Sequence, residues 1–274
     1  MDVLRVDKEK CKQDGLCAAD CPSGVIYFKP GHYPELKRGG LDICLRCGHC
    51  VAVCPHGAMD HAEVVLADCP PIDPALALSR EQTEQFLRSR RSVRRFKSRA
   101  VEKADLEQLI EIARYAPTAA NAQMLQWLVI SDQNRLKEIS ARVIEWMREL
   151  VQTSGVGLMP YMPNLIKAWD KGFDSILRSA PCLVLAMAPA TSSNGMVDLT
   201  LALSYLELAA PQFGLGTCWA GLLQSALLSV PALRQDLGIP ADYCYHYPLM
   251  IGYSAARYYR LPKRKPPQIT WWAP

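Results

Sequence analysis

The first 54 residues contain seven cysteines whose spacing could bind metal. The second cysteine run, residues 44–55, has the spacing C-x2-C-x2-C-x3-C-P. The first run, residues 11–22, keeps this spacing if Asp14 takes the place of the second cysteine. Cysteine thiolates are soft ligands that favour zinc or iron–sulfur clusters. The sequence therefore predicts two related metal sites, one of which has a carboxylate where a thiolate is expected.

The spacing resembles that of two-cluster bacterial ferredoxins, in which three cysteines of a run hold one cluster and the fourth binds the other cluster. This resemblance implies an ordinary [4Fe–4S] site with the ligands Cys44, Cys47, Cys50 and Cys21. It implies an altered site with the ligands Cys11, Cys17, Cys54 and, as an open alternative, Asp14. A carboxylate is a harder and weaker ligand for iron than a thiolate. The altered site could thus hold a [4Fe–4S] cluster with a labile iron bound by Asp14, or a [3Fe–4S] cluster.

A structural zinc site is the other reading of paired cysteines. A structural zinc site has four ligands. Such a site would account neither for the tandem runs nor for the prolines that follow Cys21 and Cys54. His49 and His56 lie within the second run and just after it, and we expect them beside the clusters or at the surface, not as ligands.

The chain has 274 residues, of which 50% are hydrophobic, and a net charge of +4. This length leaves room for two domains with buried cores. Basic residues gather in residues 88–99 and 260–265, but no helix-turn-helix or RNA-binding motif accompanies them. We therefore expect these residues to bind a phosphorylated cofactor, and we expect no nucleic-acid partner.

Four cysteines outside the runs show no paired spacing: Cys69, Cys182, Cys218 and Cys244. Because the chain opens without a signal peptide, we expect reduced thiols in a cytoplasmic protein. Apolar stretches such as residues 181–189 are too short to cross a bilayer, and residues 197–213 include Asp198 and Glu207. The sequence predicts no membrane span.

Cys-Pro pairs and glycines dominate residues 1–66, which we expect to form a small ferredoxin-like domain with short helices. Within it, residues 23–42 should form a hairpin or a loop between the two runs. Residues 67–79 read as a stiff linker, because proline favours extended chain and cannot continue a helix. Residues 80–274 should then form the second domain.

Hydrophobic periodicity predicts alternating helices and strands in the second domain. Helices are expected over residues 106–113, 136–143 and 199–210, and strands over residues 127–130, 181–187 and 247–253. This alternation indicates a sheet covered by helices. Residues 146–178 fit either a lid over a pocket or a packed surface excursion.

Four segments of the second domain stand in a distinctive order: residues 90–96 (RRSVRRF), 116–123 (APTAANAQ), 214–221 (GLGTCWAG) and 262–267 (PKRKPP). They resemble, in order, the four signatures of the FMN-dependent nitroreductase family. The resemblance covers residues from about 86 to 274, and with the cysteine runs the whole chain resembles ferredoxin-domain nitroreductases. It implies an α+β fold with a mixed sheet flanked by helices, and an intertwined homodimer with FMN at its interface.

The resemblance also implies a set of flavin-binding residues, and FMN needs cations at its phosphate and near its ring. The residues that match the phosphate side are Arg90, Ser92, Lys263 and Lys265. The residues that match the segment contributed by the partner subunit are Pro117, Thr118 and Asn121, and Gln123 of the same motif joins them. Arg94 matches the residue near the N1/O2 edge, and Gly221 with Ala220 matches the turn that meets flavin N5. Arg94 and Gly221 are thus the expected catalytic positions.

Iron–sulfur clusters move single electrons, whereas a flavin can deliver two as a hydride. We therefore expect an oxidoreductase in which the clusters relay electrons to or from FMN, which reduces a small electrophile such as a nitroaromatic, a quinone or an activated alkene. In an alternative, NAD(P)H reduces the flavin and the clusters pass electrons to an external ferredoxin or other redox protein. In a third, the chain is a non-catalytic electron-transfer module of a larger redox complex.

Overall fold

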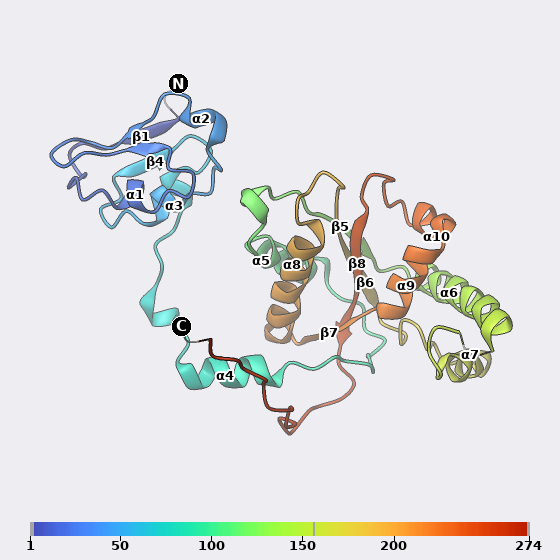
Figure 1. Ribbon diagram of the computed structural model, residues 1–274. Helices are drawn as coiled ribbons and strands as arrows, with labels where there is room; N and C mark the ends of the chain where they lie inside the picture. Colours follow the sequence, from blue (N-terminus) through green and yellow to red (C-terminus); the bar gives the residue numbers. More distant parts are fainter. Residues whose placement is uncertain (1–2, 156, 273–274) are drawn as a thin grey trace. The chain divides into compact units, whose positions relative to one another are not determined.

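A computed structural model describes residues 3–155 and 157–272 (Figure 1). The chain divides into two compact units. The first unit extends to Ala77 and includes residues 120–122, and the second comprises residues 78–119 and 123–274. Between the last cysteine run and the second unit, the proline-rich segment forms two single turns of 3-10 helix, η1 (Leu66–Asp68) and η2 (Pro74–Leu76).

The first unit is built from short elements around the cysteines. Its strands are β1 (Leu4–Val6), β2 (Ile26–Tyr27), β3 (Glu35–Leu36) and β4 (Met59–His61), and its helices are α1 (Leu16–Ala19), α2 (Gly40–Ile43) and α3 (His49–Ala52). Strand β1 pairs antiparallel with β4, and β2 with β3. The segment between the two runs is therefore a hairpin, one of the two alternatives expected. A small core that includes Val25, Val51 and Met59 packs against the cysteines.

The second unit contains one four-stranded sheet. Its strands are β5 (Gln126–Ile130), β6 (Cys182–Ala188), β7 (Leu215–Trp219) and β8 (Tyr245–Tyr253), in the order β5-β6-β8-β7. All three pairings are antiparallel, and Ser92 adds a parallel bridge to Thr217 at the edge strand. Every residue of β6 is buried, because helices cover both faces of the sheet.

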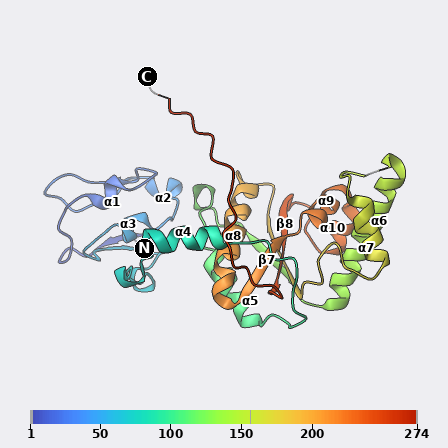
Figure 2. The ribbon, with the colours of Figure 1, turned by 90° about the horizontal axis from the view of Figure 1, so that it is seen from below.

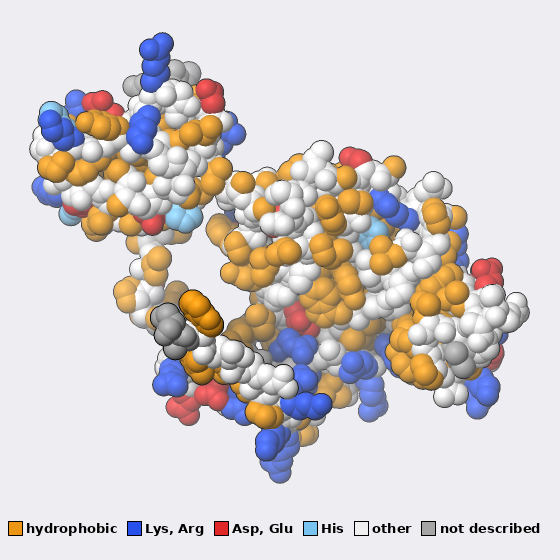
Figure 3. Space-filling view, viewed as in Figure 1, with side chains coloured by type: hydrophobic (Ala, Val, Ile, Leu, Met, Phe, Trp, Pro, Cys, Tyr) orange, Lys and Arg blue, Asp and Glu red, His pale blue; other side chains and the backbone are white. Residues whose placement is uncertain are grey.

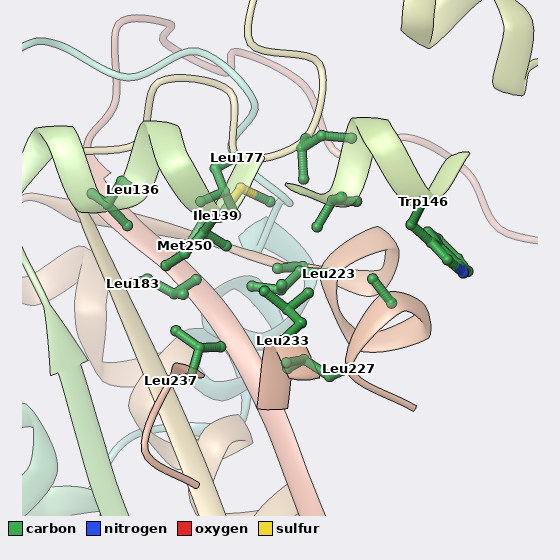
Figure 4. Close-up of a cluster of buried hydrophobic side chains, with 14 of the residues drawn as sticks. Leu136, Ile139, Trp146, Leu177, Leu183, Leu223, Leu227, Leu233, Leu237 and Met250 are labelled. Carbon is green, nitrogen blue, oxygen red and sulfur yellow. The ribbon is translucent and has the colours of Figure 1, made fainter. Parts of the chain in front are cut away.

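Apart from α4 (Arg80–Ser89), the helices of this unit divide between the two faces of the sheet (Figures 1 and 2). These other helices are α5 (Lys103–Ala113), α6 (Gln133–Ser154), α7 (Met162–Asp170), α8 (Gly195–Ala209), α9 (Gly221–Ser229) and α10 (Pro231–Asp236), with 3-10 turns η3 (Ala119–Asn121) and η4 (Ala210–Phe213). Helices α5 and α8 pack on one face through residues such as Leu109 and Leu203. Helices α6, α7, α9 and α10 cover the other face, where Leu136 and Ile139 meet Leu183 and Met250 (Figure 4).

The predicted helices and strands of this unit are all present. Their ends are shifted by at most a few residues except in α6, which continues from residue 143 to Ser154. One strand was missed: β7 lies inside the segment 214–221, which was identified from the sequence only as a flavin-family motif. Residues 146–178 are mostly packed helix, since Trp146 of α6 and both Met162 and Ile166 of α7 lie in the core. Val156 lies outside the described residues. Among the helices described, none has the length and apolar character needed to cross a membrane.

Candidate functional site

The two cysteine runs of the first unit fold in the same way. Four residues have a positive φ at matching places in the two runs: Gln13 (53°) and Gly15 (76°), then Arg46 (50°) and Gly48 (73°). In both runs the glycine precedes a four-residue helix, α1 or α3. Glycine suits this place because a left-handed backbone strains residues that have a Cβ atom. Asp14 therefore occupies the backbone position that Cys47 occupies in the other run.

Two cavities in the first unit separate the predicted cluster ligands into two sets. The first, about 500 Å³ with its open mouth included, has among its lining residues Cys21, Cys44, Cys47 and Cys50. The second, about 330 Å³ on the same measure, has among its lining residues Cys11, Asp14, Cys17 and Cys54. Each set contains one cysteine that crosses over from the other run. The sets are those that the ferredoxin spacing implies for two clusters.

The chemistry of these thiols fits a metal cluster. Burial raises the pKa of Cys17, and it raises the pKa of Cys50 to about 11. Buried thiols of this kind ionise only when a positive group lies beside them, which iron supplies. In the parts of the chain that the structure describes, no three His, Cys, Asp or Glu side chains are placed to share one metal ion. The cysteines thus surround cavities in which a bound cation would favour the thiolate form.

Two hydrogen-bond donors near the cysteine sulfur atoms come from residues 58–61, which follow the second run. The backbone N–H of Ala58 donates to Cys54 Sγ at 3.4 Å. His61, only 3% exposed at the end of β4, has Nε2 3.8 Å from Cys44 Sγ. Its Nδ1 accepts from the N–H of Glu63 at 3.1 Å, so the ring proton is on Nε2 and points to the sulfur. Sequence reasoning missed His61, because no spacing rule of the cysteine motif includes it.

Asp14 and the two histidines near the runs have different surroundings. Asp14 Oδ1 accepts from the N–H of Leu16 at 3.2 Å, and Oδ2 lies 3.2 Å from His56 Nε2. His49 is exposed and lines the first cavity. Of these two histidines, His56 is therefore the one placed beside a predicted ligand, Asp14.

In the second unit, the segment of residues 90–96 is attached to the edge and centre of the sheet. The N–H of Val93 donates to the carbonyl oxygen of Thr217 in β7 at 2.8 Å. The N–H of Lys97 donates to the carbonyl oxygen of Tyr253 in β8 at 2.8 Å. These bonds place the arginines of the segment beside β7 and beside the chain that continues from β8.

A buried carboxylate connects this segment with the motif of residues 214–221. Glu207 of α8 is 7% exposed, and its Oε1 accepts from Arg90 Nη1 at 3.0 Å and from Thr217 Oγ1 at 3.3 Å. Its Oε2 accepts from Trp219 Nε1 at 3.0 Å. From the sequence, Glu207 was used only to argue that residues 197–213 do not cross a membrane, and it was assigned no place in the flavin site. A charged residue in an apolar helix nevertheless signals a buried partner.

A basic cavity of about 970 Å³, open to solvent, brings together the two basic stretches of the sequence. Its lining residues are Leu87, Arg88, Arg90, Arg91, Leu261, Pro262, Lys263 and Arg264. Figure 3 shows Lys and Arg side chains gathered in this part of the second unit. Arg90 and Lys263, both predicted at the FMN phosphate, thus lie at one cavity, whereas Ser92 and Lys265 do not line it. The donor set suits a phosphate dianion.

The predicted ring-side residues lie at the ends of β7 and of the 90–96 segment. Arg94 is exposed, and its Nη1 donates to the carbonyl oxygen of Ser92 at 3.5 Å. Ala220 is buried, and Gly221 begins α9. A Cβ atom added to Gly221 would lie 3.6 Å from the Tyr247 hydroxyl oxygen. Burial raises the pKa of Tyr247, so this hydroxyl stays protonated beside the predicted N5 turn.

The loop of residues 116–123 is held from inside the second unit. Asp198 of α8 is 4% exposed, and its Oδ1 accepts from the N–H of Ala119 at 3.0 Å. Thr118 Oγ1 accepts from the N–H of Gln123 at 3.1 Å. Pro117, Thr118 and Gln123 all lie on this loop, and none of them lines the basic cavity. Asp198 is a second buried acid that the sequence offered only as an argument against a membrane span.

Residues 120–122 group with the first unit. The side-chain Nδ2 of Asn121 donates to the carbonyl oxygens of Leu45 and Arg46, at 3.1 Å each. Ala120 and Asn121 have positive φ values of 50° and 56°. The structure thus places this predicted flavin residue against the second cysteine run.

Comparisons with known proteins give the family. Residues 87–253 match the model of the nitroreductase family, and residues 3–55 match that of the 4Fe–4S dicluster domain. An iodotyrosine deiodinase of Thermotoga neapolitana is 30% identical over 131 residues, which are 47% of this chain and 68% of the relative. A putative NADH dehydrogenase/NAD(P)H nitroreductase of Archaeoglobus fulgidus is 26% identical over 173 residues, which are 63% of this chain and 86% of the relative.

Solved structures show the same fold for the second unit. A nitroreductase of Bacteroides fragilis with bound FMN is 19% identical, with a TM-score of 0.56, and the match covers 69% of this chain and 97% of that one. A nitroreductase of Desulfitobacterium hafniense with bound FMN is 20% identical, with a TM-score of 0.54, and covers 71% and 99%. The predicted α+β fold and the predicted enzyme class, an oxidoreductase of this family, are confirmed. The chain belongs to the nitroreductase family, and a 4Fe–4S dicluster domain precedes its family domain.

Proposed function

We propose that this protein is an iron–sulfur flavoprotein in which two clusters exchange electrons with FMN and a small organic electrophile is reduced at the flavin. The observation that carries the proposal is the separation of the eight predicted cluster ligands into two cavities, four in each. FMN is supported by the two family structures that contain it. When bound, the clusters would supply single-electron transfer and FMN would supply hydride transfer.

The residues of the chain would bind and orient these groups. Arg90 and Lys263 supply cations for the FMN phosphate, and Glu207 fixes the Arg90 guanidinium while leaving its other N–H groups for the phosphate. Arg94 would stabilise the negative charge that reduction places at the N1/O2 edge. Gly221 leaves the backbone at the N5 turn free of a side chain.

We further propose that the protein is a homodimer. Helix α4 has no buried residue in the single chain, and Leu87 on it is 51% exposed. The chain after β8 is extended (Figure 2), with Ile269 61% and both Trp271 and Trp272 87% exposed. Apolar side chains left exposed in this way favour burial against another protein surface. A second copy would cover them and, as in the family, contribute its loop of residues 116–123 to the flavin. Gel filtration should show flavin only in the dimer, and a flavin-loaded monomer would remove this claim.

The alternative in which NAD(P)H donates to the flavin is favoured by one relative, the A. fulgidus protein described as a putative NADH dehydrogenase/NAD(P)H nitroreductase. One experiment separates the two directions of electron flow. The anaerobically reconstituted dimer is mixed with NADH or NADPH while flavin absorbance and cluster EPR are followed. If a reduced ferredoxin bleaches the flavin and neither nicotinamide does, electrons enter through the clusters. If a nicotinamide bleaches it, the alternative direction holds.

The role of Arg94 has its own test. Arg94→Ala should lower the midpoint potential of the bound flavin, because the cation that stabilises the reduced ring is lost. Arg99→Ala is a matched control, since the Arg99 guanidinium lies over the Tyr253 ring, 4.2 Å from its centroid. An unchanged potential in Arg94→Ala would exclude this role.

A further inference from the structure

The two cysteine runs differ at several matched positions, and two of these differences lie at the second cavity and in contact with each other. Asp14 replaces a cysteine in the first run. The Cys-Pro-x-Gly turns at residues 21–24 and 54–57 also correspond, and their glycines have matching φ values, 58° for Gly24 and 56° for Gly57. This correspondence pairs Ser23, which lines the first cavity, with His56, which lines the second. The change of ligand and the change from Ser to His therefore occur together at the second cavity.

These two changed residues touch each other. His56 Nε2 lies 3.2 Å from Asp14 Oδ2, and the N–H of Leu16 donates to Asp14 Oδ1 at 3.2 Å. The side chains of His56 and Asp14 are 34% and 37% exposed, at the mouth of the cavity. Asp14 Oδ1 thus has a hydrogen-bond donor, and Oδ2 has the His56 ring nitrogen beside it.

We propose that His56 is a positioning residue that weakens Asp14 as an iron ligand, so that the fourth iron at this cavity exchanges with free Fe²⁺. The inference rests on the proposed function, because it requires an iron–sulfur cluster at the second cavity. With its proton on Nε2, the His56 ring would be a donor to Oδ2, as the Leu16 N–H is to Oδ1. It would draw charge away from a carboxylate that is already a weaker ligand for iron than a thiolate. To bind iron through Oδ2, Asp14 must share this oxygen with His56 Nε2 or move away from it.

The exchange is balanced in iron and in charge. A [3Fe–4S] cluster of charge 0 takes up one Fe²⁺ and becomes a [4Fe–4S] cluster of charge 2+, with no electron gained or lost. Free Fe²⁺ therefore sets which cluster is present at the second cavity. The first cavity, with four cysteines, keeps its [4Fe–4S] cluster throughout.

The test measures Fe²⁺ binding on the full-length, anaerobically reconstituted protein. Iron per chain is determined across a series of buffered Fe²⁺ concentrations. The three-iron fraction is then read without an oxidant, from the low-field EPR signal of the [3Fe–4S] cluster of charge 0, because an oxidant would itself expel the labile iron. We expect His56→Ser, which introduces the residue of the other cavity, to raise Fe²⁺ affinity by about tenfold, the lower end of the value of one hydrogen bond to a charged group. His56→Gln, which keeps an N–H donor, should stay closer to the wild type.

Three further variants show whether His56 acts through Asp14. Asp14→Cys should give a four-iron cluster at all Fe²⁺ concentrations tested, and Asp14→Ala a three-iron cluster at all of them. In the Asp14→Ala background, His56→Ser should change nothing. His32→Ala, in an exposed loop, is the control for loss of a histidine.

The outcomes separate the inference from the proposed function. An unchanged or lowered Fe²⁺ affinity in His56→Ser would overturn the inference, provided that the reduced [4Fe–4S] signal of the first cavity shows a folded protein. The proposed function itself fails if the wild-type protein takes up no iron and sulfide on reconstitution.

Discussion

His246 gives the second unit a defined dependence of stability on pH. The residue lies in β8, is 1% exposed, and its Nδ1 is 3.2 Å from Gln224 Oε1 on α9. Burial, helped by the nearby positive charge of Arg234, lowers its pKa from 6.5 to about 4. The folded protein therefore keeps this ring neutral at pH values where the unfolded chain protonates it.

The size of the effect follows from linkage between protonation and folding. The unfolded chain binds more protons than the folded one below pH 6.5, so His246 causes no loss of stability above that pH and a growing loss as pH falls toward 4. Each unit of pKa difference corresponds to about 1.36 kcal/mol, so the difference of about 2.5 units gives about 3 kcal/mol in total. Between pH 7 and pH 5, the loss is about 2 kcal/mol.

Tryptophan fluorescence suits this measurement, because all six tryptophans lie at residue 127 or later and report only on the second unit. Urea unfolding is followed at pH 7 and pH 5 for the wild type and for His246→Gln, which keeps an amide near Gln224 but does not titrate. We expect the variant to lose about 2 kcal/mol less than the wild type between the two pH values. His32→Ala, on the exposed loop, should lose as much as the wild type. Equal losses in wild type and His246→Gln would refute the reasoning.

Three other predictions concern the cofactor sites and the core. Glu207→Gln should weaken FMN binding by about tenfold in a fluorescence titration, because Arg90 loses a charged partner that fixes it, and unchanged affinity would contradict this. His61→Leu should lower the midpoint potential of the cluster at the four-cysteine cavity by about 40 mV, the equivalent of one hydrogen bond of about 1 kcal/mol. The potential is measured in an EPR-monitored redox titration. An equal or higher potential would exclude donation to the sulfur. Leu203→Ala, at a fully buried site of α8, should reduce the free energy of unfolding by about 3 kcal/mol, whereas Leu228→Ala, 68% exposed, should change it by less than about 0.5 kcal/mol.

The sequence predicted best where spacing alone determines structure. The cross-ligation rule divides the cysteines into two sets from their spacing, and each set lines one cavity. Apolar periodicity located helices such as α8 and the buried strand β6, because both have long uninterrupted apolar faces. The strand β7 was missed because Gly216 interrupts its apolar pattern, and the reason for that glycine is tertiary: a Cβ atom there would lie 2.4 Å from Val93 Cγ2.

The residues that the sequence did not reveal are those whose roles depend on distant partners. Glu207 meets Arg90 across 117 positions, and Asp198 meets Ala119 across 79. His61 reaches Cys44 only because β4 pairs with β1. Periodicity describes one element at a time, so it indicates that a buried acid needs a partner without naming that partner.

The two cysteine runs have the same backbone path although they differ in the residue at one ligand position. The backbone conformation therefore does not depend on which ligand stands there. Matching positive φ values at Gln13 and Arg46, and at the glycines that follow, give both runs the same path whether Asp14 or Cys47 stands between them. One substitution at either position can therefore alter the metal chemistry of one site while the other site keeps its own. The two predicted cluster sites of the first unit thus share one backbone design. A protein engineer could change the reduction potential of the cluster at either site by substituting one ligand, without redesigning the backbone around it.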